Sequence, residues 1–210
     1  MIPAHALNRR KTPVQARSAN TVAAISEAAI QVLLAHGRER LTTTRVAERA
    51  GVSVGTLYQY FPNKQSLLAA VLQEHLGKVM KATQRACAEH HEQPLATMVE
   101  AVVQAFVDAK LQRPDVSVAL YAVAPDLQGA ALSQRLRKGG LAAIASMLTT
   151  APDARFDDVQ AVASIVYFAM IGVVRGTLES GAPPRFVRGV KKELATLCLS
   201  YLMAAKVCDH

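Results

Sequence analysis

Hydroxyl, amide and amine side chains gather in one short stretch of the chain, residues 42–64, which reads TTTRVAERAGVSVGTLYQYFPNK. Hydroxyl groups bind phosphate oxygens or base edges, and a glutamine amide can pair with adenine through two hydrogen bonds. A glycine in the same stretch lets the backbone approach a partner closely. The stretch therefore favours contact with double-stranded DNA, through Thr42, Thr43, Thr44, Ser53, Val54, Gly55, Thr56, Tyr58, Gln59, Tyr60 and Lys64.

Two short predicted helices, separated by a tight turn, would position these side chains. Thr42 begins the first helix, and Gly51 permits the positive φ of the turn that follows it. Ser53 begins the second helix, whose buried face carries Leu57 and Phe61 and therefore turns the other side chains outward. This pattern predicts a helix-turn-helix, in which the second helix can lie in the major groove and the first can present its N-terminal N–H groups to phosphate.

The net charge of +8 is concentrated near the N-terminus, because residues 1–62 carry eight Lys or Arg residues and only three acidic residues. A basic excess on one module is typical of a protein that binds a polyanion. Four of these cations, Arg9, Arg10, Lys11 and Arg17, belong to an N-terminal arm. The arm could lie along the minor groove or the phosphates, and it could equally be a disordered tail.

Composition excludes several classes of protein. A chain with 51% hydrophobic and 19% charged residues is expected to fold. Its three Cys residues form no CxxC pair, which argues against a disulfide framework and against a zinc ribbon. No apolar run typical of a signal peptide follows Met1, so we expect a cytoplasmic protein.

Apolar residues recur at helical spacing along the chain and no segment shows strand alternation, so we expect an all-α fold. Thr12 and Pro13 are typical of a helix start, and Gly37 of a helix end. Asn63 begins a long amphipathic helix that ends near His90. Further helices are expected over residues 94–111, 114–123, 127–149, 156–178 and 184–206.

The stretch LTTTRVAERAGVSVGTLYQYFPNKQSLL, residues 41–68, resembles the DNA-binding signature of the tetracycline-repressor (TetR) family of bacterial transcription regulators. The resemblance implies a two-domain all-α homodimer, in which a bound effector changes the spacing of the two DNA-reading modules. It also implies roles for single residues. Gly55, Thr56 and Tyr58 would approach bases, while Thr43, Ser53, Gln59, Tyr60 and Lys64 would contact phosphates.

The sequence differs from the family's signature at one position, and the resemblance also suggests where one domain ends and the next begins. The family often has Lys or another polar residue where this chain has Val54, and a contact with a thymine methyl group could replace that interaction. We expect a DNA-binding helix-turn-helix domain over residues 1–62, with residues 1–12 as a flexible basic arm. Residues 63–210 would form a ligand-binding and dimerisation bundle.

A run of apolar residues between Asp158 and Arg175, VQAVASIVYFAMIGVV, is hydrophobic on nearly every face. It is shorter than the roughly 20 apolar residues of a membrane span and charged at both ends, so we expect no membrane insertion. A helix buried on two sides explains it better, with one side against its own domain and the other against a second subunit. Together with the last helix it predicts an intersubunit four-helix bundle, through Ile165, Phe168, Val190, Leu194, Leu197 and Tyr201.

An effector pocket is expected inside the bundle, where aromatic and flexible apolar side chains occur on several helices. The candidates are Phe106, Tyr121, Met147, Tyr167 and Met170. The same residues at helical spacing are also typical of an ordinary core.

Metal binding and catalysis find little support. Cys87, His90 and His91 share a helix face in the way that metal ligands can, but histidines are also favoured at a helix end by the helix dipole. No nucleophile motif, phosphate loop or metal triad is present. We therefore expect neither an enzyme nor a bound cofactor or metal.

These observations lead to one preferred function and two alternatives. We expect a dimeric transcription regulator, most simply a repressor, that a small-molecule effector releases from a palindromic operator. One alternative is an architectural DNA-binding protein without sequence preference, whose bundle only oligomerises. The other is a helical enzyme that uses the bundle as its active site.

Overall fold

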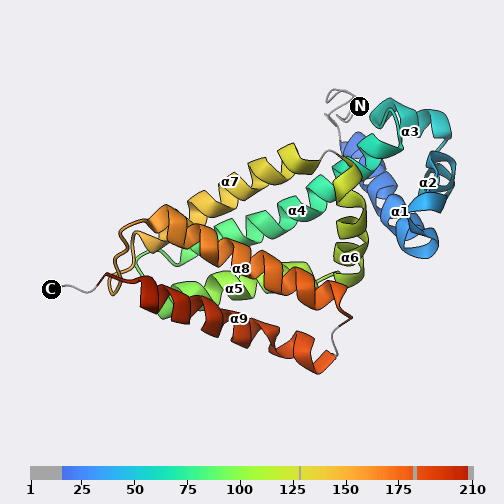
Figure 1. The fold of residues 1–210 in the computed structure, drawn as a ribbon. Coiled ribbons are helices and arrows are strands. Elements are labelled where there is room, and N and C mark those ends of the chain that lie inside the picture. The colour runs from blue at the N-terminus through green and yellow to red at the C-terminus, as the bar shows by residue number, and fades with distance from the viewer. Residues whose placement is uncertain (1–15, 128, 182–183, 208–210) are drawn as a thin grey trace. The chain divides into compact units, whose positions relative to one another are not determined.

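Helices account for every regular element in the residues that the computed structural model describes, which are 16–127, 129–181 and 184–207 (Figure 1). The predicted all-α fold is confirmed. In chain order the elements are α1 (Ala16–Arg40), α2 (Thr43–Ala50), α3 (Val54–Tyr60), α4 (Lys64–Glu89), α5 (Leu95–Leu111), α6 (Pro114–Val123), the 3₁₀-helix η2 (Ala124–Leu127), α7 (Gly129–Leu148), α8 (Val159–Glu179) and α9 (Pro184–Ala205).

Most predicted helix ends agree with the structure. At Gly37 the backbone of α1 leaves the helical conformation, with φ 71° and ψ 173°, which only glycine adopts readily. Asn63 caps α4 by accepting a hydrogen bond of 2.8 Å from the backbone N–H of Ser66. The predicted start at Thr12 and Pro13 lies outside the described residues, as do most of the basic arm and the side chain of Arg17.

Two predicted helices begin later than expected. The helix expected over 127–149 begins at Gly129, because η2 uses the preceding residues for a 3₁₀ turn. The helix expected over 156–178 begins at Val159, because the side chain of Asp158 accepts a hydrogen bond of 2.9 Å from the N–H of Ala161 and caps it there.

The chain divides into two compact units. The first contains the chain up to His75 together with Asp115–Leu132, and the second contains Leu76–Pro114 and the chain from Ser133 onward. Within the first unit, α6 is tied to α4 by a hydrogen bond of 3.0 Å between His75 Nε2 and the fully buried Ser117 Oγ. The first unit thus combines α1–α3, the beginning of α4, and α6.

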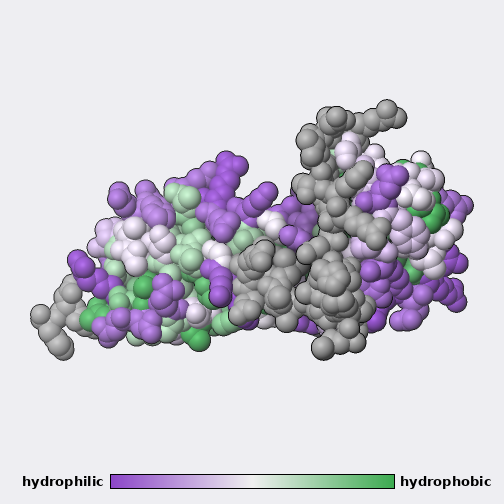
Figure 2. Space-filling model, turned by 90° about the horizontal axis from the view of Figure 1, so that it is seen from above, coloured by the Kyte–Doolittle hydropathy of each residue, from purple (hydrophilic) through white to green (hydrophobic). Residues whose placement is uncertain are grey.

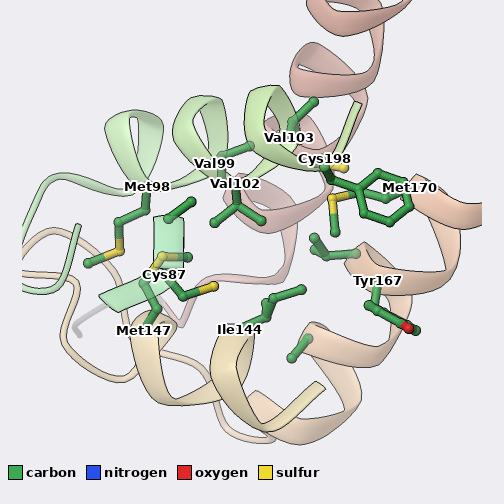
Figure 3. Packing of buried hydrophobic residues seen from close by; sticks show 14 of the residues in the cluster. Cys87, Met98, Val99, Val102, Val103, Ile144, Met147, Tyr167, Met170 and Cys198 are labelled. Carbon is green, nitrogen blue, oxygen red and sulfur yellow. The ribbon is translucent and has the colours of Figure 1, made fainter. Parts of the chain in front are cut away.

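The second unit is built around one apolar core. Its members come from the C-terminal part of α4 and from α5, α7, α8 and α9, and Figure 3 shows side chains from these helices pointing into one interior. Within this core α5 packs against both α8 and α9, and α8 packs against α9. Large, fully buried side chains in this unit include Leu95, Met98, Ile144, Met147 and Leu148.

Close packing in the second unit depends on Gly140 of α7. A Cβ atom at this position would lie 2.8 Å from Sδ and Cε of Met80 and 2.9 Å from a ring carbon of Tyr167. The thioether of Met80 could shift, but the buried ring of Tyr167 has less freedom. The glycine therefore allows α7 to approach α4 and α8.

We expect Gly140→Ala to lower the free energy of unfolding by about 1–3 kcal/mol, because overpacking of a close-packed core is destabilising. Urea unfolding monitored by circular dichroism measures the change. Gly77→Ala in α4 is the matched control, since a Cβ there would meet nothing within 4 Å. The control should be neutral or stabilising, by up to about 1 kcal/mol from helix propensity. Equal unfolding midpoints for both variants would contradict the close approach.

Candidate DNA-binding surface

The turn between α2 and α3 has the geometry that the sequence predicts. Thr42 caps α2, and its side chain accepts a hydrogen bond of 3.3 Å from the N–H of Arg45. Gly51 follows α2 in the left-handed conformation, with φ 67° and ψ 31°. Ser53 caps α3 by accepting a hydrogen bond of 3.0 Å from the N–H of Thr56. These three residues fix where each helix begins and how the chain turns between them.

One face of α3 is buried and the rest is open. Leu57 and Phe61 are 0% exposed, and Leu41 and Val46 of the same unit are likewise buried. Of the predicted contact residues, Thr42, Thr44, Ser53, Gly55, Tyr58 and Gln59 are exposed, and Thr43, Val54, Thr56, Tyr60 and Lys64 are half-buried. The burial of two apolar side chains therefore leaves a polar surface on α3 and on the start of α2. We call this surface, made by the eleven residues just named, the reading surface.

Hydroxyl groups of the reading surface are paired with one another. The hydroxyl of Tyr58 lies 3.1 Å from Thr43 Oγ1, which joins α3 to α2. Within α3, Ser53 Oγ lies 2.9 Å from Thr56 Oγ1. Each hydroxyl retains further hydrogen-bonding capacity, because it has one donor and two acceptor sites. The pairs thus hold the side chains in place while they stay able to bind a phosphate or a base.

Sequence reasoning missed Ser18 as a partner of the reading surface. Its hydroxyl lies 3.0 Å from the hydroxyl of Tyr60, across 42 positions of the sequence. The contact joins the start of α1 to the end of α3. No local pattern predicts this pairing, because it depends on how the two helices cross.

Lys64 of the reading surface and the neighbouring Arg45 bind backbone carbonyl groups at the end of α1. Lys64 Nζ donates a hydrogen bond of 2.9 Å to the carbonyl oxygen of Arg38. A guanidinium nitrogen of Arg45 donates one of 2.7 Å to the carbonyl oxygen of Arg40. Both cations therefore stabilise the end of α1 as well as adding positive charge beside α2 and α3. In Figure 2 much of the visible surface of this module is hydrophilic.

The predicted dimer residues separate into two groups in the second unit. Ile165 and Phe168 of α8 are 50% and 48% exposed, and Leu197 of α9 is 50% exposed. Tyr201 is half-buried. Val190 and Leu194 are instead 2% and 1% exposed, because they face the chain's own core. We therefore remove these two from the candidate interface and keep the open face of α8 and α9.

None of the predicted pocket residues lines either of the two hollows that the described residues form in the second unit. Phe106, Met147, Tyr167 and Met170 are members of the buried core of the second unit, while Tyr121 of α6 belongs to the first unit. Two surface hollows occur elsewhere in the second unit. One, of about 620 Å³, lies between α4 and α5 and is lined by Lys78, Ala82, Ala105, Asp108, Ala109, Leu111 and Gln112. The other, of about 370 Å³, lies between α5 and α9 and is lined by Glu100, Gln104, Lys191, Lys192, Ala195, Thr196 and Leu199.

Cys87 is a poor metal ligand in this fold. Burial raises the pKa of its thiol to about 12, which disfavours the thiolate that a metal requires. His90 already uses Nδ1 in a contact of 2.9 Å with the carbonyl oxygen of Ala86. Among the described residues no group of three or more His, Cys, Asp and Glu side chains could hold a metal ion. Burial likewise raises the pKa of Cys198, to about 11.

Two helices are long and apolar enough to cross a membrane by length and composition alone, α8 and the segment Ser18–Arg40 of α1. Core helices of soluble proteins pass the same test. In α8, Val162, Ala163, Val166, Met170 and Val174 are buried in the protein core. The hydrophobicity of α8 is therefore explained by packing and by its open face, without a bilayer.

Comparison with known proteins gives matches in both parts of the chain. The family model described as bacterial regulatory proteins, tetR family, matches residues 25–71, and the one described as tetracyclin repressor-like, C-terminal domain, matches residues 94–202. The latter alone covers half of the chain.

Three curated relatives match part of the chain. The fatty acid metabolism regulator protein of Bacillus subtilis is 33% identical over 57 residues, which are 27% of this chain and 29% of that protein. The transcriptional repressor KstR of Mycolicibacterium smegmatis is 40% identical over 62 residues, 30% of each chain. The nucleoid occlusion factor SlmA of Haemophilus ducreyi is 30% identical over 105 residues, 49% of this chain and 50% of that protein. The matches thus span between about a third and a half of these relatives.

Solved structures match over nearly the whole chain. A candidate TetR-family regulator from Mesorhizobium loti has a TM-score of 0.76 at 18% identity, covering 92% of this chain and all of that one. The fatty acid degradation regulator FadR from Bacillus halodurans has a TM-score of 0.70 at 19% identity, covering 90% of this chain and 96% of that one. At such identities the likeness shows the fold.

The contact between Ser18 and Tyr60 can be tested by a double-mutant cycle. We expect Ser18→Ala and Tyr60→Phe to show a coupling of about 0.5–1.5 kcal/mol in the free energy of unfolding, the usual value of one hydrogen bond. Ser18→Ala combined with Tyr58→Phe is the control, since the hydroxyl of Tyr58 pairs with Thr43 instead. That pair should be additive within about 0.5 kcal/mol. Additivity in both cycles would contradict a stabilising hydrogen bond between Ser18 of α1 and Tyr60 of α3.

Proposed function

The chain belongs to the tetracycline-repressor family of bacterial regulatory proteins, and from this premise we propose that it is a transcription regulator that a small-molecule effector releases from a palindromic operator. Members of the family are DNA-binding regulators, which are generally not enzymes, and they typically dimerise and bind small effectors. The observation that carries the proposal is the reading surface, a polar surface held outward by the burial of Leu57 and Phe61.

We assign the contacts with bases to residues on the open side of α3. Gly55 lets the α3 backbone approach the groove, and Thr56 and Tyr58 offer hydroxyls to base edges. Because Tyr58 is already paired with Thr43, its ring has a fixed direction before DNA binds. Less side-chain freedom is then lost on binding, which favours affinity. Val54 supplies an apolar contact for a thymine methyl group.

Phosphate contacts surround the base contacts. Thr42, Thr43 and Thr44 stand at the N-terminal end of α2, where the positive end of the helix dipole and free N–H groups bind phosphate. Further phosphate contacts come from Ser53 before α3, from Gln59 and Tyr60 in its last turn and from Lys64 beyond it, and they fix the register of α3 on the duplex. The basic arm of residues 1–12 adds charge to the same DNA-binding domain, which we place in residues 1–62.

A homodimer would bring two reading surfaces to one operator. The open face of α8 and α9 exposes about half of each of Ile165, Phe168 and Leu197. A second copy of the same face would cover these side chains and form a four-helix bundle around a two-fold axis. The two reading surfaces would then meet half-sites spaced by about 34–36 Å or a multiple of it.

Repression with release by an effector is the mode of regulation that we propose. Names of relatives such as the repressor KstR and the regulator FadR support it. The match to KstR covers 62 residues, 30% of each chain, so what that protein's name says of repression comes to this chain only as a proposal. The effector site would lie in residues 63–210, and the protein would act in the cytoplasm, where the chromosome is.

An architectural role is the second candidate, and the match to SlmA favours it, because that protein is named as a nucleoid occlusion factor. An architectural protein would bind most sequences alike. The reading surface argues against this, since Gln59 and the α3 hydroxyls suit base edges as well as phosphates.

We expect Thr56→Ala and Tyr58→Phe each to weaken operator binding by about tenfold to a hundredfold, because a good base contact contributes about 1–3 kcal/mol. Fluorescence anisotropy with the promoter fragment upstream of the gene measures this. Tyr121→Phe, in α6, is the control and should bind as the parent does. Two variants that bind like the parent would overturn the contact assignment.

The same assay separates a regulator from an architectural protein. Affinity for the promoter fragment should exceed affinity for random duplex by at least roughly 10³-fold. Affinity for the promoter fragment should also fall by a factor of about 10³ to 10⁵ between 50 and 200 mM salt, if the dimer neutralises roughly 6–10 phosphates. Equal affinity for both duplexes would favour the architectural role.

The dimer is tested by placing a charge on the open face. We expect Phe168→Glu to shift the protein from dimer to monomer in light scattering after gel filtration, because two buried carboxylates would face each other across the two-fold axis. Leu34→Glu is the control, since Leu34 is a 39% exposed apolar residue of α1, outside this face. A dimeric Phe168→Glu variant would place the interface elsewhere.

A further inference from the structure

A hollow of about 370 Å³ lies between α5 and α9 in the second unit, and we call it the α5–α9 hollow. The two helices pack against each other and run in opposite directions (Figure 1). Near one end of the hollow, Lys191 of α9 forms an ion pair with Asp108 of α5. Sites that bind small organic molecules have volumes of roughly 300–1,000 Å³. The hollow is therefore large enough for such a molecule.

The floor of the α5–α9 hollow is apolar and its rim is polar. Ala195 and Leu199 of α9 are partly buried and pack against the core of the second unit. The exposed side chains around them are Glu100 and Gln104 of α5 and Lys192 and Thr196 of α9. An apolar floor with a few polar groups is typical of a site for a small molecule.

The carboxylate and the ammonium group of this rim belong to opposite ends of the hollow. Because the helices are antiparallel, Glu100 lies beside the Leu199 end, while Lys192 lies beside the ion pair of Lys191 and Asp108. Glu100 and Asp108 are separated by a rise of about 12 Å along α5. Within the described part of the chain, neither Glu100 nor Lys192 makes an ion pair or a side-chain hydrogen bond. Both charges can therefore meet opposite charges of a ligand.

An amide and a hydroxyl group lie between the two charges. Gln104 is one turn from Glu100 on α5, and Thr196 is one turn from Lys192 on α9. The hydroxyl of Thr196 donates a hydrogen bond of 3.0 Å to the carbonyl oxygen of Lys192 and keeps its acceptor sites. The amide of Gln104 can both donate and accept. The middle of the hollow therefore suits a peptide group, which has one donor and one acceptor.

We propose that the α5–α9 hollow binds a short peptide with free termini, its ammonium group at Glu100, its carboxylate at Lys192 and a peptide group at Gln104 and Thr196. Three extended residues span about 10 Å, which matches the length of helix between the two charges. Small apolar side chains of the peptide would cover Ala195. The inference goes beyond the proposed function, because it requires neither operator DNA nor a dimer.

Ligands with a single charge fit the hollow less well. An anion would gain at Lys192 and be repelled by Glu100, and a cation would meet the reverse, whereas a molecule with both charges gains at both ends. The hollow between α4 and α5 does not offer the same arrangement. The only carboxylate among its lining residues is that of Asp108, which already pairs with Lys191.

Four compounds that differ in their charged groups or in length test the proposal. Trialanine carries both charges, N-acetyl-trialanine lacks the ammonium group, trialanine amide lacks the carboxylate, and alanine is too short to reach both ends. Each is titrated into the full-length ¹⁵N-labelled protein at low ionic strength, where exposed charges are least screened. The Kd is measured from the NMR shifts of backbone amides in α5 and α9. We expect trialanine to bind, and each of the others to bind about two- to fivefold more weakly, as for loss of one exposed charge pair.

Two variants remove the charges of the hollow one at a time. Glu100→Gln should bind trialanine and its N-acetyl form alike, while it still prefers trialanine to the amide. Lys192→Met should show the opposite pattern. Glu193→Gln and Lys81→Met are the matched controls, since these exposed charges of α9 and α4 do not line the hollow. Both controls should distinguish the peptides as the parent does, and thermal unfolding checks that every variant folds.

The outcomes separate this inference from the proposed function. No binding of trialanine, equal affinity for trialanine and its blocked forms, or unchanged discrimination in either hollow variant overturns the peptide site. Shifts confined to residues outside α5 and α9 overturn it as well. Promoter binding in the same preparation reports on the proposed function independently, because none of these titrations contains DNA.

Discussion

The burial of Leu57 and Phe61 is the interaction on which the DNA-binding surface depends. A helix of seven residues such as α3 is too short to form by itself in water. It exists because these two side chains, both 0% exposed, complete the interior of the first unit. Their burial determines which sides of α3 stay open. The positions of Thr56, Tyr58 and Gln59 are therefore a consequence of apolar packing beneath them.

Hydrogen bonds between hydroxyl groups fix the directions of side chains whose positions are set by apolar packing. The pair of Thr43 and Tyr58 connects α2 with α3, and the pair of Ser18 and Tyr60 connects α1 with α3. Each pair lies at or near the surface, so its contribution to stability is modest. Its larger effect is on direction, because a paired tyrosine ring has fewer orientations to lose when a ligand binds. All three helices of the module thereby contribute to one surface.

The second unit carries one feature that its own fold does not require. The open face of α8 and α9 exposes apolar area that a monomer gains nothing by exposing. Val190 and Leu194 show how such features differ from ordinary core, since they have the same apolar character and are simply covered by the chain itself.

The sequence by itself determined the helices, the turn at Gly51, the caps at Thr42 and Ser53, and the buried face of α3, because caps, glycine turns and helical periodicity are local properties. Only the tertiary structure decided that Ser18 meets Tyr60 and that Val190 and Leu194 are core. The reason is physical: these relations depend on how helices distant in sequence cross, and periodicity tells which face of a helix is apolar but not what covers it.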